Sequence, residues 1–307
     1  MSGKQESEPV IPPHRSGAID DPRLPLNPYS DDQQPWPGLA EKMDPLPDHG
    51  EKSYKGNDRL KGKRALVTGG DSGIGRATAI AYAREGADVA ICFHPDEESD
   101  ARTVIELIEA EGRKALALPA DIRDERAARK VVDDALQALG GLEILVLNAG
   151  RQQSQESITD ITSDAFDATI KTNIYAPFWM AQQAVPHLKK GASIIVTSSI
   201  NAYSPSADLL DYAMTKGALK VFAQALARQL APKGMRVNAV APGPFWTALQ
   251  VSGGQPREAL PKFGADSVLG RAGQPVEIAP IYVLLASDEA SYITGEVYGA
   301  TGGSGLG

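Results

Sequence analysis

The sequence predicts an α/β fold with a doubly wound parallel sheet. Short apolar runs alternate with helical patterns from about residue 60 to the end of the chain. Strands that are apolar on both faces are typical of a parallel sheet covered by helices on both sides. Right-handed crossovers between such strands produce the doubly wound arrangement. We therefore expect one domain over 60–307, preceded by a different kind of segment over 1–59.

Each predicted strand is a short apolar run that ends in glycine or a polar residue, and helical patterns fill the intervals. The pattern over 96–112, for example, opens with acidic residues and stops at Gly112, as a helix does. We expect strands at 65–70, 87–93, 114–121, 143–150, 192–199, 235–243 and 296–303, and helices at 73–86, 96–112, 124–139, 164–189, 209–231 and 276–287.

The segment 1–59 differs in composition from the rest. Ten of the 22 prolines precede Gly50, and no apolar period of 2 or 3.6 persists there. Such a segment buries too little surface to offset its ordering entropy, so we predict no helix or strand in it. Two interpretations remain: a disordered tail, or an extended arm that lies on a neighbouring subunit. The arm would be anchored by Tyr29, Trp36, Leu39 and Met43.

Composition excludes several classes of protein. The net charge of −8 argues against nucleic-acid binding, which needs a clustered positive field. No run approaches the roughly 18 apolar residues of a membrane span, and the polar start MSGKQESEPV is unlike a secretory signal. The single cysteine, Cys92, cannot form an internal disulfide. We expect a soluble cytoplasmic protein that binds neither nucleic acid nor membrane.

A glycine-rich turn follows the first predicted strand and opens the next helix. Glycines in this place permit a tight turn and let the backbone approach a pyrophosphate, whose charge faces the helix N-terminus. The spacing differs from G-x-G-x-x-G, and a plain turn between strand and helix remains the alternative. The residues that would bind a dinucleotide here are Gly69, Asp71, Ser72, Gly73, Ile74 and Gly75.

Other predicted strand ends meet the glycine turn at the same edge of the sheet, where ligands of such folds bind. Asp121 and Ile122 end the third strand, and Asn148, Ala149 and Gly150 end the fourth. They could hold adenine and ribose, or they could be ordinary strand ends.

The end of the second strand bears on the choice of cofactor. Enzymes that use NAD often place an acid there to bind the ribose 2′-hydroxyl. This chain has Phe93 and His94, and Asp96 comes later, inside the next helix. Nothing at Phe93 would repel a 2′-phosphate, although no arginine or lysine would clamp one. NAD or NADP therefore both fit, with a slight preference for NADP.

The run Asp211-Tyr212-Ala213-Met214-Thr215-Lys216 opens a predicted helix. Residues i and i+4 share a helix face, so Tyr212 and Lys216 can point into one site. A nearby cation favours the phenolate and makes proton transfer by a phenol practical. Ser199 ends the preceding strand and can reach the same substrate oxygen. Tyr-x-x-x-Lys alone is common on solvated helices, so this interpretation depends on Ser199.

One more polar residue stands out in an apolar neighbourhood. Asn173 precedes Pro177 in the helix predicted at 164–189. It could be a buried amide whose hydrogen bonds are satisfied, or an amide that kinks the helix and holds a water.

Together these residues resemble the short-chain dehydrogenases/reductases over roughly 60–307, in family order and spacing. The matching motifs are Thr68-Gly69-x-x-x-Gly73-x-Gly75, Asn148-Ala149-Gly150, Asn173, Ser199, Tyr212-x-x-x-Lys216, and Pro242-Gly243-x-x-x-Thr247. Within the family the chain is most similar to glucose/ribitol dehydrogenase-like oxidoreductases, which also have a Pro-rich extension and a PDHGEKSY-like segment (47–54).

The resemblance implies a Rossmann fold and an NAD(P)-dependent oxidoreductase acting on an aldehyde, sugar or small ketone. It implies that Tyr212 is the acid/base, that Ser199 positions the reacting oxygen, that Lys216 lowers the tyrosine pKa and binds ribose, and that Asn173 holds a relay water. It also implies that Tyr212, Lys216, Pro242, Gly243 and Thr247 contact the coenzyme. Enoyl reductases of this fold separate tyrosine and lysine more widely, which favours carbonyl chemistry here.

The segment 243–275 is too long and glycine-rich for a simple connector. Phe245, Trp246 and Phe263 would make it a partly apolar lid over the substrate, although packing of the loop itself explains them equally well. The polar residues Asn201, Ser204 and Asp208 could meet substrate hydroxyls.

Three further expectations concern an alternative function, metal binding and assembly. A catalytically idle dinucleotide-binding stress or sensor protein is the alternative function, but such a binder need not keep Tyr212 and Lys216 together. No cluster of metal ligands is visible in the sequence. Helices at 164–189 and 209–231 carry apolar residues on more than one face, and the family forms tetramers, so we expect a homotetramer. The apolar residues concerned are Phe178, Trp179, Met180, Phe222 and Leu226.

Overall fold

The computed structural model describes residues 29–306 and contains all seven predicted strands in one parallel sheet. The strand order is β3-β2-β1-β4-β5-β6-β7, and every neighbouring pair is parallel. The order reverses direction between β1 and β4, which is where ligands bind in such sheets. The strands are β1 Arg64–Thr68, β2 Asp88–Phe93, β3 Ala115–Pro119, β4 Ile144–Leu147, β5 Ser193–Thr197, β6 Arg236–Pro242 and β7 Val297–Ala300. The predicted fold class is confirmed.

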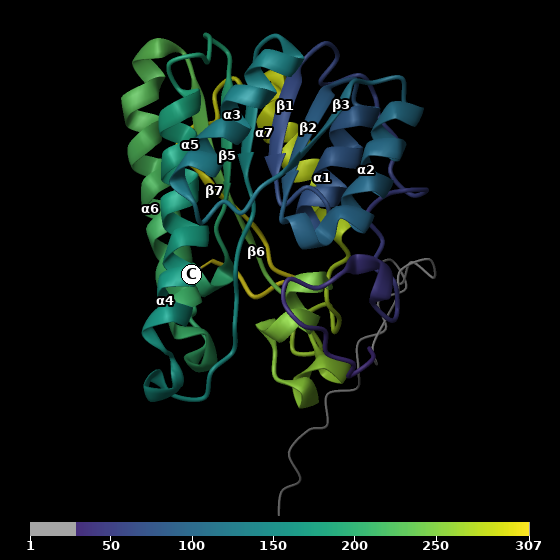
Figure 1. Cartoon of the computed structure of the whole chain (residues 1–307), viewed down its shortest axis with the longest axis vertical. Coiled ribbons are helices and arrows are strands. Elements are labelled where there is room, and N and C mark those ends of the chain that lie inside the picture. Colours follow the sequence, from purple (N-terminus) through teal and green to yellow (C-terminus); the bar gives the residue numbers. More distant parts are fainter. Residues whose placement is uncertain (1–28, 307) are drawn as a thin grey trace, which may run out of the picture.

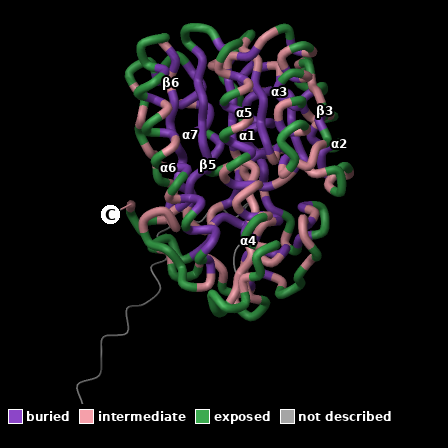
Figure 2. Tube along the Cα trace, turned by 60° about the vertical axis from the view of Figure 1, so that its left-hand side comes forward, coloured by how far each residue is buried: buried purple, intermediate pink, exposed green. Residues whose placement is uncertain are grey.

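Helices cover both faces of the sheet (Figure 1). On one face α1 packs against α2 and α7; on the other, α3 packs against α5, beside α6. Each layer buries its own apolar cluster against the strands, so the buried trace runs through the centre of the molecule (Figure 2). The helices are α1 Gly73–Arg84, α2 Glu98–Ala110, α3 Glu125–Leu139, α4 Ser163–Ile170, α5 Ala176–Ala184, α6 Leu210–Leu230 and α7 Pro275–Ala286.

Shorter turns connect these elements. The 3₁₀ segments are Ala40–Lys42, Pro95–Glu97, Ile158–Asp160, Ile200–Ala202, Ala207–Leu209, Ala231–Lys233, Arg257–Lys262 and Asp288–Ala290, and a second π-helical turn spans Gln250–Gly254. Within 29–306 no helix combines the length and apolar character that crossing a membrane requires.

The single helix predicted at 164–189 is wrong in detail. The structure has α4, a π-helical turn at Lys171–Tyr175, and α5, which ends at Ala184. Pro177 has no N–H to donate to the carbonyl four residues earlier, so the regular ladder cannot continue through this point. The wider turn places Asn173 at the kink, and π-turns of this kind are frequent at functional sites.

The described part of the N-terminal arm, 29–59, packs on its own chain. Tyr29 and Met43 are buried with Trp246 in a small third core, and Tyr29 stacks on Trp246 with ring centroids 4.1 Å apart. From the sequence these residues were expected either to lie in a disordered tail or to contact a neighbouring subunit. Instead, the lid at 243–275 provides an apolar surface for them in the same chain. The short turn Ala40–Lys42 also corrects the expectation of no helix here.

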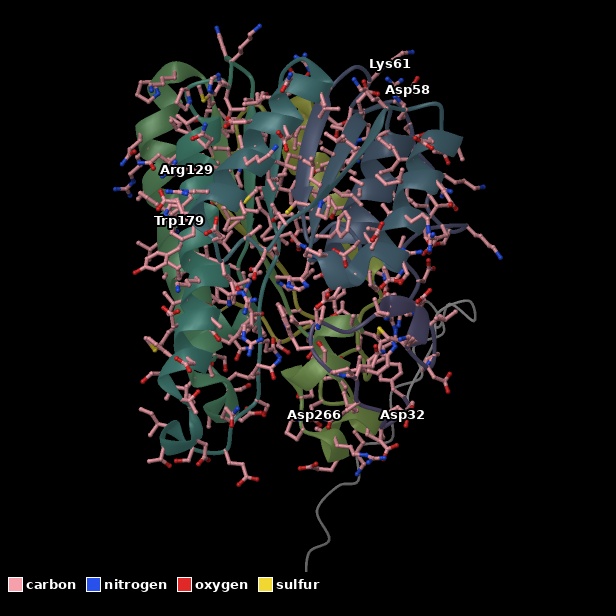
Figure 3. The ribbon with its side chains drawn as sticks, in the orientation of Figure 1. Asp32, Asp58, Lys61, Arg129, Trp179 and Asp266 are labelled. Carbon is pink, nitrogen blue, oxygen red and sulfur yellow. The ribbon has the colours of Figure 1, made fainter. Side chains whose placement is uncertain are left out.

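The arm runs along the molecule from one end to the other. Asp32 in the arm lies at the end of the molecule that carries Asp266 of the lid, whereas Asp58 and Lys61 lie at the opposite end, where the arm leads into β1 (Figure 3). The remaining predicted arm residues, 1–28, lie outside the described part of the chain.

Candidate active site

A cavity of about 400 Å³ opens at the carboxyl edge of the sheet. Residues that follow β1, β2, β3, β4, β5 and β6 all line it, as does the start of α6. Among the predicted site residues, the cavity brings together Gly69, Asp71, Ser72, Gly73, Ile74, Phe93, His94, Asp121, Ile122, Asn148, Ala149, Gly150, Ser199, Tyr212, Lys216, Pro242, Gly243 and Thr247. Gly75 and Asn173 stand behind this lining.

The glycine turn after β1 has a backbone that only glycine fits. Gly69 and Gly73 have φ angles of +61° and +50°, in the left-handed region. A Cβ at Gly75 would lie 1.8 Å from the carbonyl oxygen of Gly69, so a side chain there would push the turn apart. The turn thereby stays flat against the cavity at the start of α1. This is the cradle that a dinucleotide pyrophosphate requires.

Asn148 ties three strands together beneath the cavity. Its side-chain nitrogen donates to the Thr68 carbonyl oxygen at 3.1 Å, and its Oδ1 accepts from Thr197 Oγ1 at 3.1 Å. Thr68 Oγ1 in turn accepts from the backbone N–H groups of Asn148 and Ala149. The residue therefore fixes the relative positions of β1, β4 and β5 rather than pointing freely into the cavity.

Tyr212, Ser199 and Lys216 converge at the β5 and α6 side of the cavity. The Tyr212 phenol hydrogen-bonds the Ser199 side chain. Lys216 Nζ lies 5.3 Å from the centroid of the Tyr212 ring and donates to the Thr197 carbonyl at 2.8 Å. The backbone of Lys216 is held as well, because Ser198 Oγ donates to its carbonyl at 2.8 Å. All three side chains are at least 90% buried.

Burial is the main cause of the pKa shifts of Tyr212 and Lys216. It raises the pKa of Tyr212 to about 12, against a smaller lowering by the Ser199 hydrogen bond. It also lowers the pKa of Lys216 to about 8. Burial therefore sets the direction of the Tyr212 pKa in this structure, and the lowering expected from Lys216 stays a prediction.

Asn173 is completely buried and its amide is used within the protein. Nδ2 donates to the Arg151 carbonyl and to Thr215 Oγ1, each at 2.9 Å, and Oδ1 accepts from the Arg151 backbone N–H at 2.7 Å. Both N–H groups are engaged, so only Oδ1 keeps a lone pair for another donor. The structure therefore shows that the hydrogen bonds of the Asn173 amide are satisfied within the protein and that Asn173 lies at the kink. That it also holds a relay water remains a hypothesis.

The opposite end of the cavity lies beside β2 and β3. Phe93 is buried, and His94 caps the turn that leads to α2. Asp121 forms a two-pronged ion pair with Arg123, with Arg123 Nη2 2.6 Å from Asp121 Oδ2. This pairing occupies the carboxylate that was expected to bind adenine, although its residue still lines the cavity.

Two carboxyl groups face this end of the cavity. Only the first, Asp71, was expected from the sequence to contact the coenzyme. Asp71, in the glycine turn, is 1% exposed, and neither of its oxygens has a hydrogen-bond partner. Glu97 lines the same cavity and accepts from the His94 N–H at 3.1 Å. Burial raises the pKa of both groups; the Asp71 charge raises that of Glu97 further, and the Asp100 charge raises that of Asp71. The pair therefore favours one negative charge over two at neutral pH, with the charge on Asp71 and the proton on Glu97.

Sequence analysis missed Glu97, although a signal for it exists. The run His94-Pro95-Asp96-Glu97 has proline at the first helical position and glutamate two residues later, which is the pattern of a capping box. In a capping box the glutamate folds back toward the residue before the helix. That fold returns Glu97 to the end of β2, where an acid for ribose was sought and not found.

The three aromatic residues of the lid divide between the cavity and the core. Phe245 and Phe263 line the cavity, but Trp246 is fully buried in the core shared with the arm, since its indole N–H donates to the Pro45 carbonyl. Of the polar residues expected to meet hydroxyls, Asn201 lines the cavity. Ser204 is exposed outside it, and Asp208 accepts from Ser154 Oγ.

Comparison with known proteins agrees with this geometry. A family model described as enoyl-(acyl carrier protein) reductase matches residues 69–304. The chain is 58% identical to the uncharacterized oxidoreductase YghA of Escherichia coli, over 91% of this chain and 95% of that one. It is 43% identical to glucose and ribitol dehydrogenase of Daucus carota, over 89% and 95% of the two chains.

A solved structure matches as well. A short-chain dehydrogenase from Burkholderia cenocepacia in complex with NADP superposes with a TM-score of 0.74 at 39% identity, covering 80% of this chain and 98% of that one. The glycine cradle and the unpartnered polar atoms beside it show that the residues of this cavity fit a nicotinamide dinucleotide. The chain belongs to the short-chain dehydrogenase/reductase family of NAD(P)-dependent oxidoreductases.

Proposed function

We propose that this enzyme interconverts a carbonyl compound and an alcohol, with Tyr212 as the acid/base. The observation that carries the proposal is the convergence of three buried side chains, Tyr212, Ser199 and Lys216, on one side of the cavity. A bound nicotinamide coenzyme supplies or accepts the hydride. The chain's own residues then have to orient the substrate oxygen and move its proton.

Each residue has a role that follows from its position. With a pKa of about 12, Tyr212 carries its proton at neutral pH and can donate it to a carbonyl oxygen. Ser199 hydrogen-bonds the same phenol and can hold that oxygen in line. Lys216 is positioned by the Thr197 carbonyl, and its ammonium favours any negative charge that develops on the phenol.

The substrate class rests on the spacing and on the lining of the cavity. The three-residue gap between Tyr212 and Lys216 favours carbonyl chemistry over the C=C reduction named in the family description. Polar side chains of Asn201, Ser206 and Gln255 line the cavity beside the lid. They suit a substrate with several hydroxyls, such as a sugar or polyol, which is what the name of the carrot relative describes.

The coenzyme proposal follows from the two carboxyls at the other end. Asp71 and Glu97 carry acceptors and at least one negative charge where the adenosine ribose is expected. Such groups bind a 2′-hydroxyl and repel a 2′-phosphate. We therefore propose that the enzyme accepts both coenzymes and prefers NAD, in place of the slight preference for NADP that Phe93 alone suggested.

Assembly and location complete the proposal. Phe178 and Val221 are exposed apolar residues on α5 and α6, with 48% and 58% of their surfaces accessible, which fits a homotetramer. Met180, expected on such a surface, is instead in the core of the chain at 1%. The single cysteine, Cys92, is free and buried, which fits a cytoplasmic location.

The decisive experiment is the variant Tyr212→Phe. Removal of the hydroxyl keeps the ring and should reduce turnover by about 10²–10⁴-fold, the usual contribution of a positioned acid or base. Affinity for NAD⁺, measured by calorimetry, should stay within about twofold. Turnover is followed at the reduced-nicotinamide absorbance across a panel of aldehydes, sugars and polyols with both coenzymes.

The outcomes separate the two candidate functions. Loss of turnover with intact binding supports the enzyme mechanism. Undiminished turnover in the variant would refute the role of Tyr212. Binding of coenzyme with no turnover of any panel substrate by the unmodified chain would favour the idle dinucleotide-binding sensor instead.

A further inference from the structure

One residue of the N-terminal arm, Trp36, reaches the edge of the cavity. It lines the cavity together with Pro37. Its ring lies 4.9 Å from that of His94, nearly edge-on, and the guanidinium carbons of Arg123 and Arg151 lie 5.3 and 5.2 Å from its centroid. His94, Arg123 and Arg151 follow β2, β3 and β4, so one indole bridges the ends of three strands.

The arm holds this indole by contacts on both sides of the cavity. On the lid side, the Gln34 N–H donates to the Val251 carbonyl at 2.9 Å. On the α2 side, the Ala40 N–H donates to the buried Asp100 carboxylate at 2.6 Å. Between them, the Gln34 side chain bonds both the N–H and the carbonyl of Leu39, which closes a loop with Trp36 at its tip.

The loop is also packed too closely to shift. Gly38 has a φ of +85°, and a Cβ there would lie 2.8 Å from Ser252 Cβ in the lid. A segment that served only to tether the arm would not need so close an approach at the cavity edge. The position of Trp36 is therefore fixed by its neighbours in the lid and not by the indole alone.

The contacts of Trp36 place it at one particular end of the cavity. β2 and β3 form the edge of the sheet that is separated from β5 by β1 and β4. Tyr212 and Ser199 stand at the β5 side, whereas His94 and Arg123 stand at the β2 and β3 side. Trp36 is thus on the adenosine side of the proposed coenzyme site and away from the reacting groups.

The charges around Trp36 suit a neutral aromatic ligand group. Arg123 is already paired with Asp121, whereas Nε of Arg151 is buried without a hydrogen-bond partner. The indole of Trp36, with two guanidinium groups near it, offers apolar contact without adding charge. We propose that Trp36 forms part of the binding site for the adenine half of the coenzyme, so that docking of the arm and binding of the dinucleotide stabilise each other.

This inference goes beyond the fold shared with the Burkholderia enzyme. That structure is matched over 98% of its length by only 80% of this chain, so the unmatched fifth is about as long as the arm. The match to YghA extends to 91% of this chain and so includes part of the arm. The inference rests on the proposed coenzyme site, but not on the proposed substrate or on Tyr212.

The test compares two ligands that share the adenine half. Binding of NAD⁺ and of ADP-ribose, which lacks nicotinamide, is measured by calorimetry on the full chain. Trp36→Ala should weaken both ligands by the same factor, about tenfold, which is typical for loss of an aromatic contact to a base. Lys216→Ala, at the other end, should weaken NAD⁺ more than ADP-ribose. Trp179→Ala, on α5 and away from the arm (Figure 3), should change neither.

A fluorescence experiment with a more conservative variant tests the same inference if Trp36→Ala fails to fold. The chain has three tryptophans, so Trp36→Phe removes one emitter and keeps an aromatic ring. ADP-ribose should quench the fluorescence of the unmodified chain and of Trp179→Phe, but much less that of Trp36→Phe, which should still bind.

Two results would overturn the inference. Unchanged ADP-ribose affinity in Trp36→Ala, with quenching retained in Trp36→Phe, would show that Trp36 is only a tether. Tighter binding in Trp36→Ala would show that the indole obstructs the site. If the unmodified chain bound neither ligand, the coenzyme site itself would be wrong, whereas binding without turnover would leave this inference standing and remove only the proposed chemistry.

Discussion

The two ends of the cavity differ in how their polar groups are held. At the chemical end, Lys216 is fixed by the Thr197 carbonyl and by Ser198, and the amide of Asn173 is bonded on both sides. At the adenosine end, both oxygens of Asp71 and Nε of Arg151 are buried without partners. One end is complete within the protein, and the other has donors and acceptors left over.

This difference suggests that one end of the cavity positions the reacting groups and the other selects the coenzyme. Groups that act on a reacting oxygen must not move during the reaction, so their protein bonds are an advantage. Groups that discriminate between ligands are most effective when leaving them without a hydrogen bond carries a large free-energy penalty. A ligand that lacks the matching atom then binds poorly. We infer that the chemical end sets the rate and the adenosine end sets the coenzyme.

The largest expected effect comes from breaking the element that both ends share, the glycine turn. Gly75→Ala places a Cβ 1.8 Å from the Gly69 carbonyl oxygen, so the turn must shift. We expect affinity for both coenzymes to fall at least about a hundredfold, or ~2.7 kcal/mol, within the range of overpacking penalties. Calorimetry with NAD⁺ and NADP⁺ measures it.

The matched control for this prediction is Gly217→Ala. Gly217 is also helical, and a Cβ there meets nothing within 4 Å. Affinity should be unchanged, and the helix should gain up to about 1 kcal/mol. Equal coenzyme affinity in Gly75→Ala and the unmodified chain would show that the turn is not the pyrophosphate cradle.

A smaller effect should distinguish the two ends directly. Asp71→Asn removes the ionised carboxyl from the adenosine end and leaves the Tyr212 side intact. We expect the preference for NAD⁺ over NADP⁺, taken from dissociation constants, to fall by about tenfold, or ~1.4 kcal/mol. Turnover at saturating NAD⁺ should stay within about twofold.

Glu98→Gln is the control for charge alone, since Glu98 is an exposed acid at the start of α2. It should leave the coenzyme preference unchanged. If Asp71→Asn did the same, the charged carboxyl would not face the ribose, and the selective role of the adenosine end would be lost.

The chemical end could be predicted from the sequence because its residues lie at short, regular spacings. Tyr212 and Lys216 share one helix face, and Ser199 ends the adjacent strand, so local geometry was sufficient. All seven strands could be predicted for the same reason. The direction of the Tyr212 pKa could not, because it depends on how far the fold buries the phenol.

The adenosine end could not be predicted because distant segments build it. Trp36 meets Arg123 and Arg151, and Asp100 receives the arm backbone, across separations of about 60 residues or more. No spacing rule links such positions. The sequence left Trp246 open between substrate contact and packing for a related reason, because the arm that buries it is distant in the sequence.

The smallest expected effect concerns the fastening of the arm at 48–51, which contacts α1 and the start of α7. His49 is buried, its Nδ1 lies 3.1 Å from Glu51 Oε1, and Glu51 also pairs with Arg76. Burial lowers the pKa of His49 below its ordinary value. The unfolded chain therefore takes up a proton near pH 6.5 that the folded chain resists, so stability is present above that pH and is lost as the pH falls.

We expect the melting temperature to fall between pH 7.5 and 5.5, and to fall less in His49→Gln, since the slope from one histidine is at most about 1.4 kcal/mol per pH unit. Glu51, whose pKa is lowered to about 2, contributes only at lower pH and stays outside this window. His187→Gln, at an exposed position, should decline as the unmodified chain does. Equal declines in all three proteins would show that His49 does not fasten the arm. If instead ADP-ribose affinity fell with pH while Tyr212-dependent turnover at saturating coenzyme did not, the arm would be acting on the adenosine end alone.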